Sequence, residues 1–360
     1  MGENTVRIVF TTPYYPPHIG GIEIHVKHLA SFLSKKHEVK VISSTGSSSR
    51  DVEVLKLRCL NLPYSPIPLS FPKLEADVYH SHIPSPFFAR MISKEKLSPH
   101  IITYHNDVLV PEVVDGYEIP YLGREFIERF NERISIPLLD SCDTIIATTS
   151  SYALTSPILS RFMEKIEVIP NGVDTKRFRP GETERETIVL YVGRLVEYKG
   201  VDVLLRAMKI VQEDLREARL VIIGDGEDRE RLEELSKKLG VEAEFKGKLP
   251  DESVSTWMKK ARVLVLPSFS RLEAFGIVLL EAMASATPVI GSNIPGVRDV
   301  AIEGGLTFSD TDDLAKKIME VLSNDRLAEK LSRKGLKAVK EKYSWEIISR
   351  KIEKLYLSLI

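Results

Sequence analysis

Short apolar runs rich in β-branched residues alternate along the chain with longer segments whose apolar residues recur every three or four positions. Residues 6–10 form such a run and predict a strand, and residues 22–33 carry apolar side chains at helical spacing. Further strands of this half are expected at residues 39–43, 78–80, 101–104, 144–147 and 166–169. The order of strand then helix is typical of a parallel sheet.

The alternation stops at residues 170–181, where turn residues indicate a linker, and then restarts. Strands of the second half are expected at residues 188–192, 220–223, 243–245, 263–266, 288–290 and 306–308. Helices are expected at residues 201–211, 229–239, 254–259, 276–284 and 314–322, with a helix-rich tail from residue 327 that is broken near residues 343–345.

Two rounds of alternation predict an α/β protein with two Rossmann-like domains, each a doubly wound parallel sheet. The expected domains are residues 1–170 and 171–342, and residues 343–360 are expected to form a helix that crosses back to the first domain. Because ligands of such sheets bind beyond the carboxyl ends of the strands, we expect the site in a cleft across which the two domains face each other.

The overall composition narrows the class of protein. The formal net charge of −1 gives no indication of a nucleic-acid partner. The two cysteines, Cys59 and Cys142, are too few for a disulfide framework and lack metal-ligand spacing. No uncharged apolar run approaches about 18 residues, and strand-like residues follow residues 1–5 at once, so neither a transmembrane helix nor a signal peptide is expected. These features favour a cytoplasmic protein.

Two glutamates in the second half carry the strongest chemical signal. Glu273 lies in a polar loop after an expected strand, and Glu281 lies in an otherwise apolar helix, where a lone carboxylate costs several kcal/mol unless it is partnered. The free amides of Phe275, Gly276 and Ile277 at the start of that helix form an anion site. Carboxylates for hydroxyl groups beside amides for phosphate predict a sugar nucleotide. The alternatives are a loop-capping carboxylate at Glu281 and an exposed acid at Glu273.

Two cations flank another helix start. Arg194 and Lys199 lie between an expected strand and the helix that follows it. The macrodipole disfavours cations there unless a dianion is bound between them, and arginine offers a fork while lysine offers a point charge. The alternative is a pair of solvated surface cations.

Weaker signals lie at other strand ends. Gly20 and Gly21 follow the first strand and allow a phosphate to approach the backbone closely, although such a pair is also an ordinary turn. His105 ends a strand, and Leu249 follows one where backbone atoms can meet a nucleobase. Residues 223–227 lack the third glycine of the dinucleotide fingerprint and indicate a tight turn.

The histidines do not predict a metal site. His80 and His82 end a strand together, but the sequence places no third ligand beside them. No Asp-x-Asp motif lies at a strand end to hold a divalent cation. We therefore expect neither a metal nor another cofactor.

Taken together, these motifs resemble the signatures of the family 4 retaining glycosyltransferases, which have the GT-B fold. The resemblance covers essentially the whole chain and rests on Gly20-Gly21, His105, Asn171-Gly172-Val173-Asp174, Arg194 with Lys199, and Glu273 with Glu281. It implies that Arg194 and Lys199 hold the donor diphosphate and that Glu281 binds the ribose hydroxyls. It further implies that Glu273 contacts the donor hexose.

The same resemblance assigns the remaining positions. The amides of Phe275, Gly276 and Ile277 would lie near the donor, Gly20-Gly21 would close on its phosphates, and His105 would lie beside the transferred sugar. Family members often carry glycine after the first glutamate, whereas this chain has Ala274, which bears on the identity of the donor sugar.

The expected activity is metal-independent, retaining transfer of a hexose from a nucleoside-diphosphate sugar, with UDP- or GDP-sugars favoured, to a carbohydrate or lipid-linked hydroxyl acceptor. The alternatives are a nucleotide-sugar epimerase of the same fold and a non-catalytic nucleotide-sugar-binding module. Residues 124–134 have an apolar face at helical spacing, for which an ordinary core-facing helix is the favoured interpretation. Contact with the inner membrane surface is the alternative.

Overall fold

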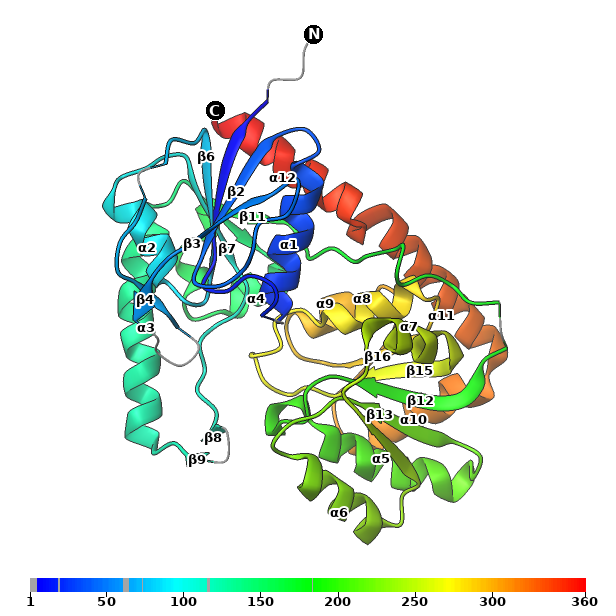
Figure 1. Cartoon of the computed structure of the whole chain (residues 1–360). Helices are drawn as coiled ribbons and strands as arrows, with labels where there is room; N and C mark the ends of the chain where they lie inside the picture. The colour runs from blue at the N-terminus through cyan, green and yellow to red at the C-terminus, as the bar shows by residue number, and fades with distance from the viewer. Residues whose placement is uncertain (1–4, 19, 61–64, 73, 115–116, 183) are drawn as a thin grey trace. The chain divides into compact units, whose positions relative to one another are not determined.

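The computed structural model describes residues 5–18, 20–60, 65–72, 74–114, 117–182 and 184–360 (Figure 1). Residues 1–4 of the expected first domain and Ile19 of the glycine loop lie outside these ranges. The chain divides into two compact units. Unit 1 comprises residues 1–112, 119–171 and 345–360, and unit 2 comprises residues 113–118 and 172–344.

Unit 1 is built on a seven-stranded sheet in which every neighbouring pair is parallel. Its strands are β1 (Arg7–Thr11), β2 (Glu38–Ser43), β3 (Glu53–Lys56), β6 (Val78–Ile83), β7 (His100–Tyr104), β10 (Thr144–Ala147) and β11 (Ile166–Val168). The strand order is β11-β10-β7-β6-β1-β2-β3, so the chain leaves β1 toward one side of the sheet and returns to β6 on the other. The place where the order reverses is between β1 and β6.

Helices accompany this sheet. They are α1 (Gly21–Leu33), α2 (Phe87–Lys94), α3 (Tyr121–Ser141), α4 (Ser150–Thr155) and α12 (Trp345–Leu359), with short 3₁₀ turns at Leu159–Arg161 and Met163–Lys165. Two small antiparallel pairs complete the first part of the chain, β4 (Cys59–Leu60) with β5 (Ile67–Pro68) and β8 (Val113–Val114) with β9 (Tyr117–Glu118). The tail helix α12 packs against α1, so the last segment of the chain belongs to the first unit.

Unit 2 contains a six-stranded, all-parallel sheet in the order β14-β13-β12-β15-β16-β17. Its strands are β12 (Glu186–Val192), β13 (Arg219–Ile223), β14 (Ala243–Gly247), β15 (Ala261–Leu266), β16 (Val289–Ser292) and β17 (Gly305–Phe308). Its helices are α5 (Val201–Asp214), α6 (Arg229–Leu239), α7 (Asp251–Lys260), α8 (Ile277–Ala284), α9 (Val297–Ala301), α10 (Thr311–Ser323) and α11 (Asp325–Ala338), with a 3₁₀ turn at Glu197–Lys199 and a π-helical turn at Val339–Tyr343.

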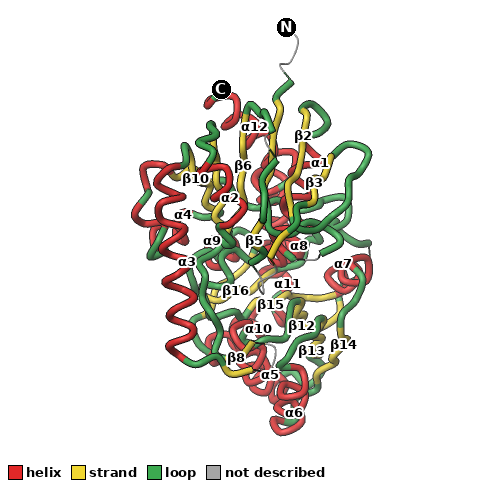
Figure 2. Tube along the Cα trace, turned by 60° about the vertical axis from the view of Figure 1, so that its left-hand side comes forward, coloured by secondary structure: helices red, strands yellow, loops and turns green. Residues whose placement is uncertain are grey.

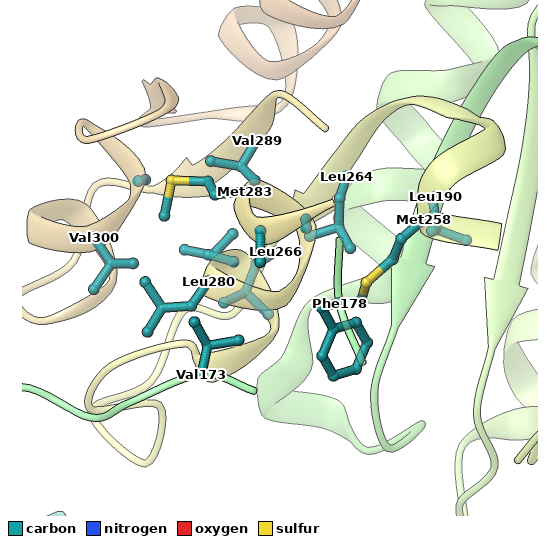
Figure 3. Packing of buried hydrophobic residues seen from close by; sticks show 14 of the residues in the cluster. Val173, Phe178, Leu190, Met258, Leu264, Leu266, Leu280, Met283, Val289 and Val300 are labelled. Atoms are coloured by element: carbon teal, nitrogen blue, oxygen red, sulfur yellow. The ribbon is translucent and has the colours of Figure 1, made fainter. Parts of the chain in front are cut away.

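Successive residues of the central strand β12 enter different cores. Leu190 packs with Met258 of α7 and Leu280 of α8 in one buried cluster, part of which Figure 3 shows. The neighbouring residue Val189 joins a second cluster with Leu204 of α5. Because side chains of a strand point alternately to opposite faces, the two clusters cover the two faces of the sheet. Helices lie beside the strands in both units in Figure 2. The prediction of two doubly wound parallel sheets is confirmed.

The reversal of strand order in unit 2 lies between β12 and β15. The connections that leave the carboxyl ends of these two strands diverge to opposite sides of the sheet, which leaves room for a ligand between them. The loops that carry Arg194, Lys199 and Glu273 are these connections.

Several elements were not expected from the sequence. The edge strand β3 and the short helices α2, α4 and α9 were missed because each is too short for its apolar spacing to stand out. The interpretation of residues 124–134 as a core-facing helix was wrong. Within α3, the side chain of Phe126 is 70% exposed and that of Phe130 is 49% exposed. Among the described helices, none is both long and apolar enough to cross a bilayer.

Candidate functional site

The loop after β12 is held by close contacts between backbones. Gly193 donates its amide to the carbonyl oxygen of Ile223 at 3.0 Å, and Leu195 donates to that of Asp225 at 2.9 Å. A Cβ atom on Gly224 would lie 1.8 Å from the carbonyl oxygen of Gly193. Only glycine therefore fits here. The turn at residues 223–227, expected to be a tight turn, positions the exposed side chain of Arg194 in the neighbouring loop.

Lys199 is the last residue of the 3₁₀ turn that leads into α5. Gly200 caps α5 with a positive φ of 68°, and a Cβ atom there would lie 2.3 Å from the carbonyl oxygen of Pro267. The loops after β12 and β15 are therefore packed backbone against backbone at this point. This packing brings Lys199 close to the loop that carries Glu273.

Lys199 and Glu273 form an ion pair with 2.5 Å between Nζ and Oε2, and their side chains are only 16% and 14% exposed. Burial by itself lowers the pKa of Lys199, but the charge and hydrogen bond of Glu273 outweigh it, and the net effect raises the pKa. The lysine is therefore a fixed cation at neutral pH. The second carboxylate oxygen of Glu273 accepts a hydrogen bond from the amide of Gly276 at 3.2 Å.

The start of α8 lies beside this pair. Gly276 precedes the helix with a φ of 80°, and a Cβ atom there would come within 2.7 Å of Leu266. Phe275 is buried in the core under the loop, and Ile277 is partly buried as the first residue of the helix. Their amides lie at the amino-terminal end of α8, where a helix favours negative charge.

Glu281 lies one turn further along α8. Leu279, Leu280 and Ala282 around it are buried. Burial, followed by the charge of Asp251, raises the pKa of Glu281 to about 7. A carboxylate held at this cost is typical of a functional site.

Leu249, which was expected to offer backbone atoms to the nucleobase, follows β14. It is partly buried against the core that also holds Phe275. The structure thus brings Lys199 and Glu273 into direct contact, with Gly276 hydrogen-bonded to Glu273. No described contact links Leu249 to that group.

In unit 1, the glycine pair lies at the start of α1. Gly20 is the residue before the helix, and a Cβ atom there would lie 2.3 Å from Oε2 of Glu23. Glu23 is 7% exposed and its other carboxylate oxygen lies 3.0 Å from Nδ1 of His18. Burial raises the pKa of Glu23. Sequence reasoning missed this glutamate, although its position in the first turn after a glycine pair was visible in the sequence.

His105 follows β7 and is close to two further histidines. Its Nε2 atom lies 3.1 Å from Nδ1 of His82 at the end of β6. The His25 ring, from α1, packs edge-on against His105 with 5.0 Å between ring centroids. Burial lowers the pKa of all three imidazoles, that of His25 to about 4, so the rings are neutral at neutral pH. Sequence reasoning did not include His25, because its distance along the chain gives no sign of this contact.

His80 plays a different part. Its Nδ1 atom lies 2.6 Å from the hydroxyl group of Tyr356 in α12, and its Nε2 atom lies 2.7 Å from that of Thr103. Both ring nitrogens therefore have partners. His25 also packs edge-on against Trp345, the first residue of α12, so the tail helix supports the histidine cluster.

Two families match the chain in tandem. The family described as Glycosyltransferase Family 4 matches residues 19–177, and the family described as Glycosyl transferases group 1 matches residues 172–338. An uncharacterized glycosyltransferase of Methanocaldococcus jannaschii is 29% identical over an alignment of 394 positions, gaps included, that covers 98% of each chain. A phosphatidyl-myo-inositol mannosyltransferase of Mycolicibacterium smegmatis is 26% identical and covers 98% of this chain and 93% of its own.

Solved structures share the fold over nearly the whole length. Sucrose-phosphate synthase from Thermosynechococcus elongatus superposes with a TM-score of 0.79 at 22% identity, covering 98% of both chains. Anabaena HepE in complex with UDP and glucose gives a TM-score of 0.74 at 16% identity, covering 98% of this chain and all of the other. This chain belongs to the family 4 glycosyltransferases, has the GT-B fold, and is a nucleotide-sugar-dependent glycosyltransferase.

Proposed function

We propose that the protein transfers a hexose from a nucleoside-diphosphate sugar to a hydroxyl group of an acceptor with retention of the anomeric configuration. The observation that carries this proposal is the arrangement beyond β12 and β15. There Lys199, Glu273 and the amide of Gly276 are joined in one hydrogen-bonded group. A cation and helix amides suit a diphosphate, and a carboxylate suits sugar hydroxyls.

Arg194 and Lys199 bind the diphosphate, and their charge matters most when the leaving group gains negative charge. This is electrostatic stabilisation by groups already in place before the reaction. Glu281 binds the ribose hydroxyls, and Leu249 offers backbone atoms to the nucleobase. Glu273 binds the hexose, with the amides of residues 275–277 close to the donor phosphates.

Unit 1 contributes Gly20 and Gly21, which approach the phosphates, and His105, which lies beside the transferred sugar. The neutral state of His105 supports this role. A neutral imidazole donates one hydrogen bond without adding a charge that would compete with the cations of unit 2 for the diphosphate.

Retention is supported by the surroundings of Asp107, the alternative to Glu273 as a carboxylate nucleophile. A double displacement requires a carboxylate nucleophile close to the anomeric carbon. Asp107, which follows His105 by two positions, is 5% exposed. Its Oδ1 atom accepts hydrogen bonds from the hydroxyl groups of Tyr104 at 2.9 Å and Ser156 at 2.6 Å. These contacts give Asp107 a structural role and favour transfer on the face of the departing phosphate, which then helps to deprotonate the acceptor.

UDP- and GDP-sugars are the favoured donors, and a carbohydrate or a lipid-linked saccharide is the acceptor. The exposed apolar face of α3, with Phe126 and Phe130 stacked at 6.2 Å between centroids, suits contact with a lipid surface. We therefore place the enzyme in the cytoplasm, with its acceptor domain in peripheral contact with the inner membrane surface.

The experiment begins with thermal unfolding in the presence of UDP-, GDP- and ADP-sugars, since a ligand of the folded state raises the apparent stability. The stabilising donor is then incubated with saccharide and lipid-linked acceptors, and the anomeric proton of the product is observed by NMR. A small anomeric coupling from an α-configured gluco or galacto donor supports retention. A large coupling contradicts it, and an epimerised nucleotide sugar without transfer identifies an epimerase.

A further inference from the structure

Three histidines from three separate elements of unit 1 converge on one point. They are His25 of α1, His82 at the end of β6 and His105 directly after β7. Each offers one ring nitrogen, and these three atoms lie within 4.8 Å of one another. Since β6 and β7 are neighbours in the sheet, His82 and His105 are brought together by strand pairing, and α1 supplies the third ring.

Several ring nitrogens of this trio lack a close hydrogen-bond partner among the described residues. Neither ring nitrogen of His25 nor the Nε2 atom of His82 makes a close hydrogen bond there, although the side chain of Asn171 lies near His25 and interacts with its ring. A buried polar nitrogen without a partner costs about 1–3 kcal/mol. His80, on the same strand as His82, shows the contrast, because hydroxyl groups meet both of its nitrogens. The trio therefore contains ring nitrogens that are available to bind a ligand.

The distances suit a metal ion. Nitrogen ligands lie about 2.0–2.1 Å from zinc, which places them roughly 3.4 Å from each other in a tetrahedral site. The observed separation of 3.1 Å between His82 and His105 is close to this value, and the nitrogen of His25 lies within 4.8 Å of both.

We propose that His25, His82 and His105 bind a divalent cation of the later first transition row, such as Zn²⁺, Co²⁺ or Ni²⁺. Neutral imidazole suits these ions, whereas Mg²⁺ prefers oxygen ligands. Ligating histidines of tight sites are usually oriented by an acceptor on the second ring nitrogen, and the described residues supply none to the Nε2 atom of His82. The affinity is therefore expected to be lower than that of structural zinc sites.

Binding has a consequence that rests on the proposed function. If His105 lies beside the transferred sugar, an ion on its Nε2 atom fixes the ring and adds a positive charge that competes with the cations of unit 2 for the diphosphate. The metal would then inhibit transfer rather than assist it. The site would act as an inhibitory site, separate from the groups that hold the diphosphate.

The test uses Co²⁺ as a probe of the full chain in the absence of any sugar nucleotide. We expect one equivalent to bind with the intense visible absorption of a four-coordinate ion, and Zn²⁺ to displace it. The variants His25→Gln and His82→Gln should each bind at least about tenfold more weakly. The matched control is His28→Gln, which removes a partly buried histidine one turn further along α1 and should bind Co²⁺ as the wild type does.

Thermal unfolding without metal shows whether each variant folds. If neither trio variant folds, the wild-type spectrum decides, because the weak absorption of a six-coordinate ion or binding of less than one equivalent overturns the proposal. Undiminished binding in a folded His25→Gln variant also overturns it. A turnover assay is a separate readout. Binding without inhibition leaves the metal site standing and contradicts the position given to His105.

Discussion

The Nζ atom of Lys199 lies 2.5 Å from Oε2 of Glu273 and so joins the two loops that leave the central strands of unit 2. The pair is mostly buried, and removing one partner leaves the other uncompensated. In the proposed function, Lys199 serves both the donor diphosphate and Glu273. The position of the proposed hexose-binding carboxylate would then be coupled to the presence of the diphosphate.

Replacing Lys199 or Arg194 by alanine should slow transfer much more than it weakens donor binding. The charge on the leaving diphosphate grows toward the transition state, so the lost stabilisation appears mainly in kcat. We expect kcat to fall on the order of 10²–10³-fold. Steady-state kinetics together with calorimetric donor binding measure the two effects separately. Lys209→Ala, which removes an exposed cation from α5, is the control, and a wild-type kcat in both site variants would contradict the assignment.

Gly200→Ala should disturb the site through the backbone. A Cβ atom there meets the carbonyl oxygen of Pro267 at 2.3 Å, so the loop that carries Lys199 has to move. A displacement of about 1 Å can cost on the order of 10²-fold in rate. Gly240→Ala is the matched control, because its φ of 70° is nearly the same but nothing lies within 4 Å of the added atom.

The control variant isolates the cost of the left-handed backbone, about 1–2 kcal/mol, without a collision. Gly240→Ala should therefore lose stability and keep its kcat. Circular dichroism on heating and steady-state kinetics provide both readouts. Equal kinetic losses in the two variants would show that the contact with Pro267 does not position Lys199.

The stability of the protein should depend on pH through Glu281. The pKa of this carboxyl rises from an ordinary value of 4.5 to about 7 in the folded state. At pH values below the ordinary pKa the group is protonated in both states and has no effect. As the pH rises between the two values, only the unfolded chain ionises, so the free energy of unfolding falls, by about 3 kcal/mol once the folded pKa is passed.

Glu281→Gln removes this titration. From about pH 5 to about pH 8 the variant should therefore gain stability relative to the wild type. Thermal unfolding of both proteins at the two pH values measures the difference. The same variant should bind the nucleotide sugar more weakly if the carboxylate accepts the ribose hydroxyls. A constant difference in melting temperature across the pH range would contradict the raised pKa.

Membrane contact should depend on the apolar face of α3. Burying one phenylalanine side chain is worth about 1.5–3 kcal/mol, so replacing Phe126 and Phe130 by serine should lower binding to vesicles of phosphatidylcholine and phosphatidylglycerol by more than tenfold. Both side chains are exposed, so the fold should tolerate the change. Leu154→Ser, which removes a side chain that is 60% exposed on α4, is the control. Co-sedimentation with vesicles gives the answer, and equal binding by all three proteins would exclude this face.

Catalysis should continue without a divalent cation. In the proposed function, Arg194, Lys199 and the amino terminus of α8 supply the positive charge that a metal would otherwise bring to the diphosphate. After metal-free dialysis and in excess chelator, turnover should equal that of the untreated enzyme. Loss of activity that Mg²⁺ or Mn²⁺ restores would mean that the diphosphate is held differently.

The sequence by itself determined the two sets of strands and helices and the identity of the chemical groups. The run at residues 263–266 predicted β15, and the structure extends it only to Ala261–Leu266, because a fully buried strand has a compositional signal of its own. Arg194, Lys199 and Glu281 were singled out as candidates for a similar reason. A charge at a helix start or inside an apolar helix is costly, and the sequence shows that cost directly.

Only the tertiary structure decided which of these groups meet. Lys199 contacts Glu273 because β15 pairs with β12, although β13 and β14 come between them along the chain. His25 of α1 meets His82 of β6 and His105 after β7, although all three lie far apart along the chain. The exposure of Phe126 likewise depends on what packs beside α3. Local spacing encodes the period of an element and the face that is apolar, but the order of strands in a sheet results from long-range packing, which no local pattern records.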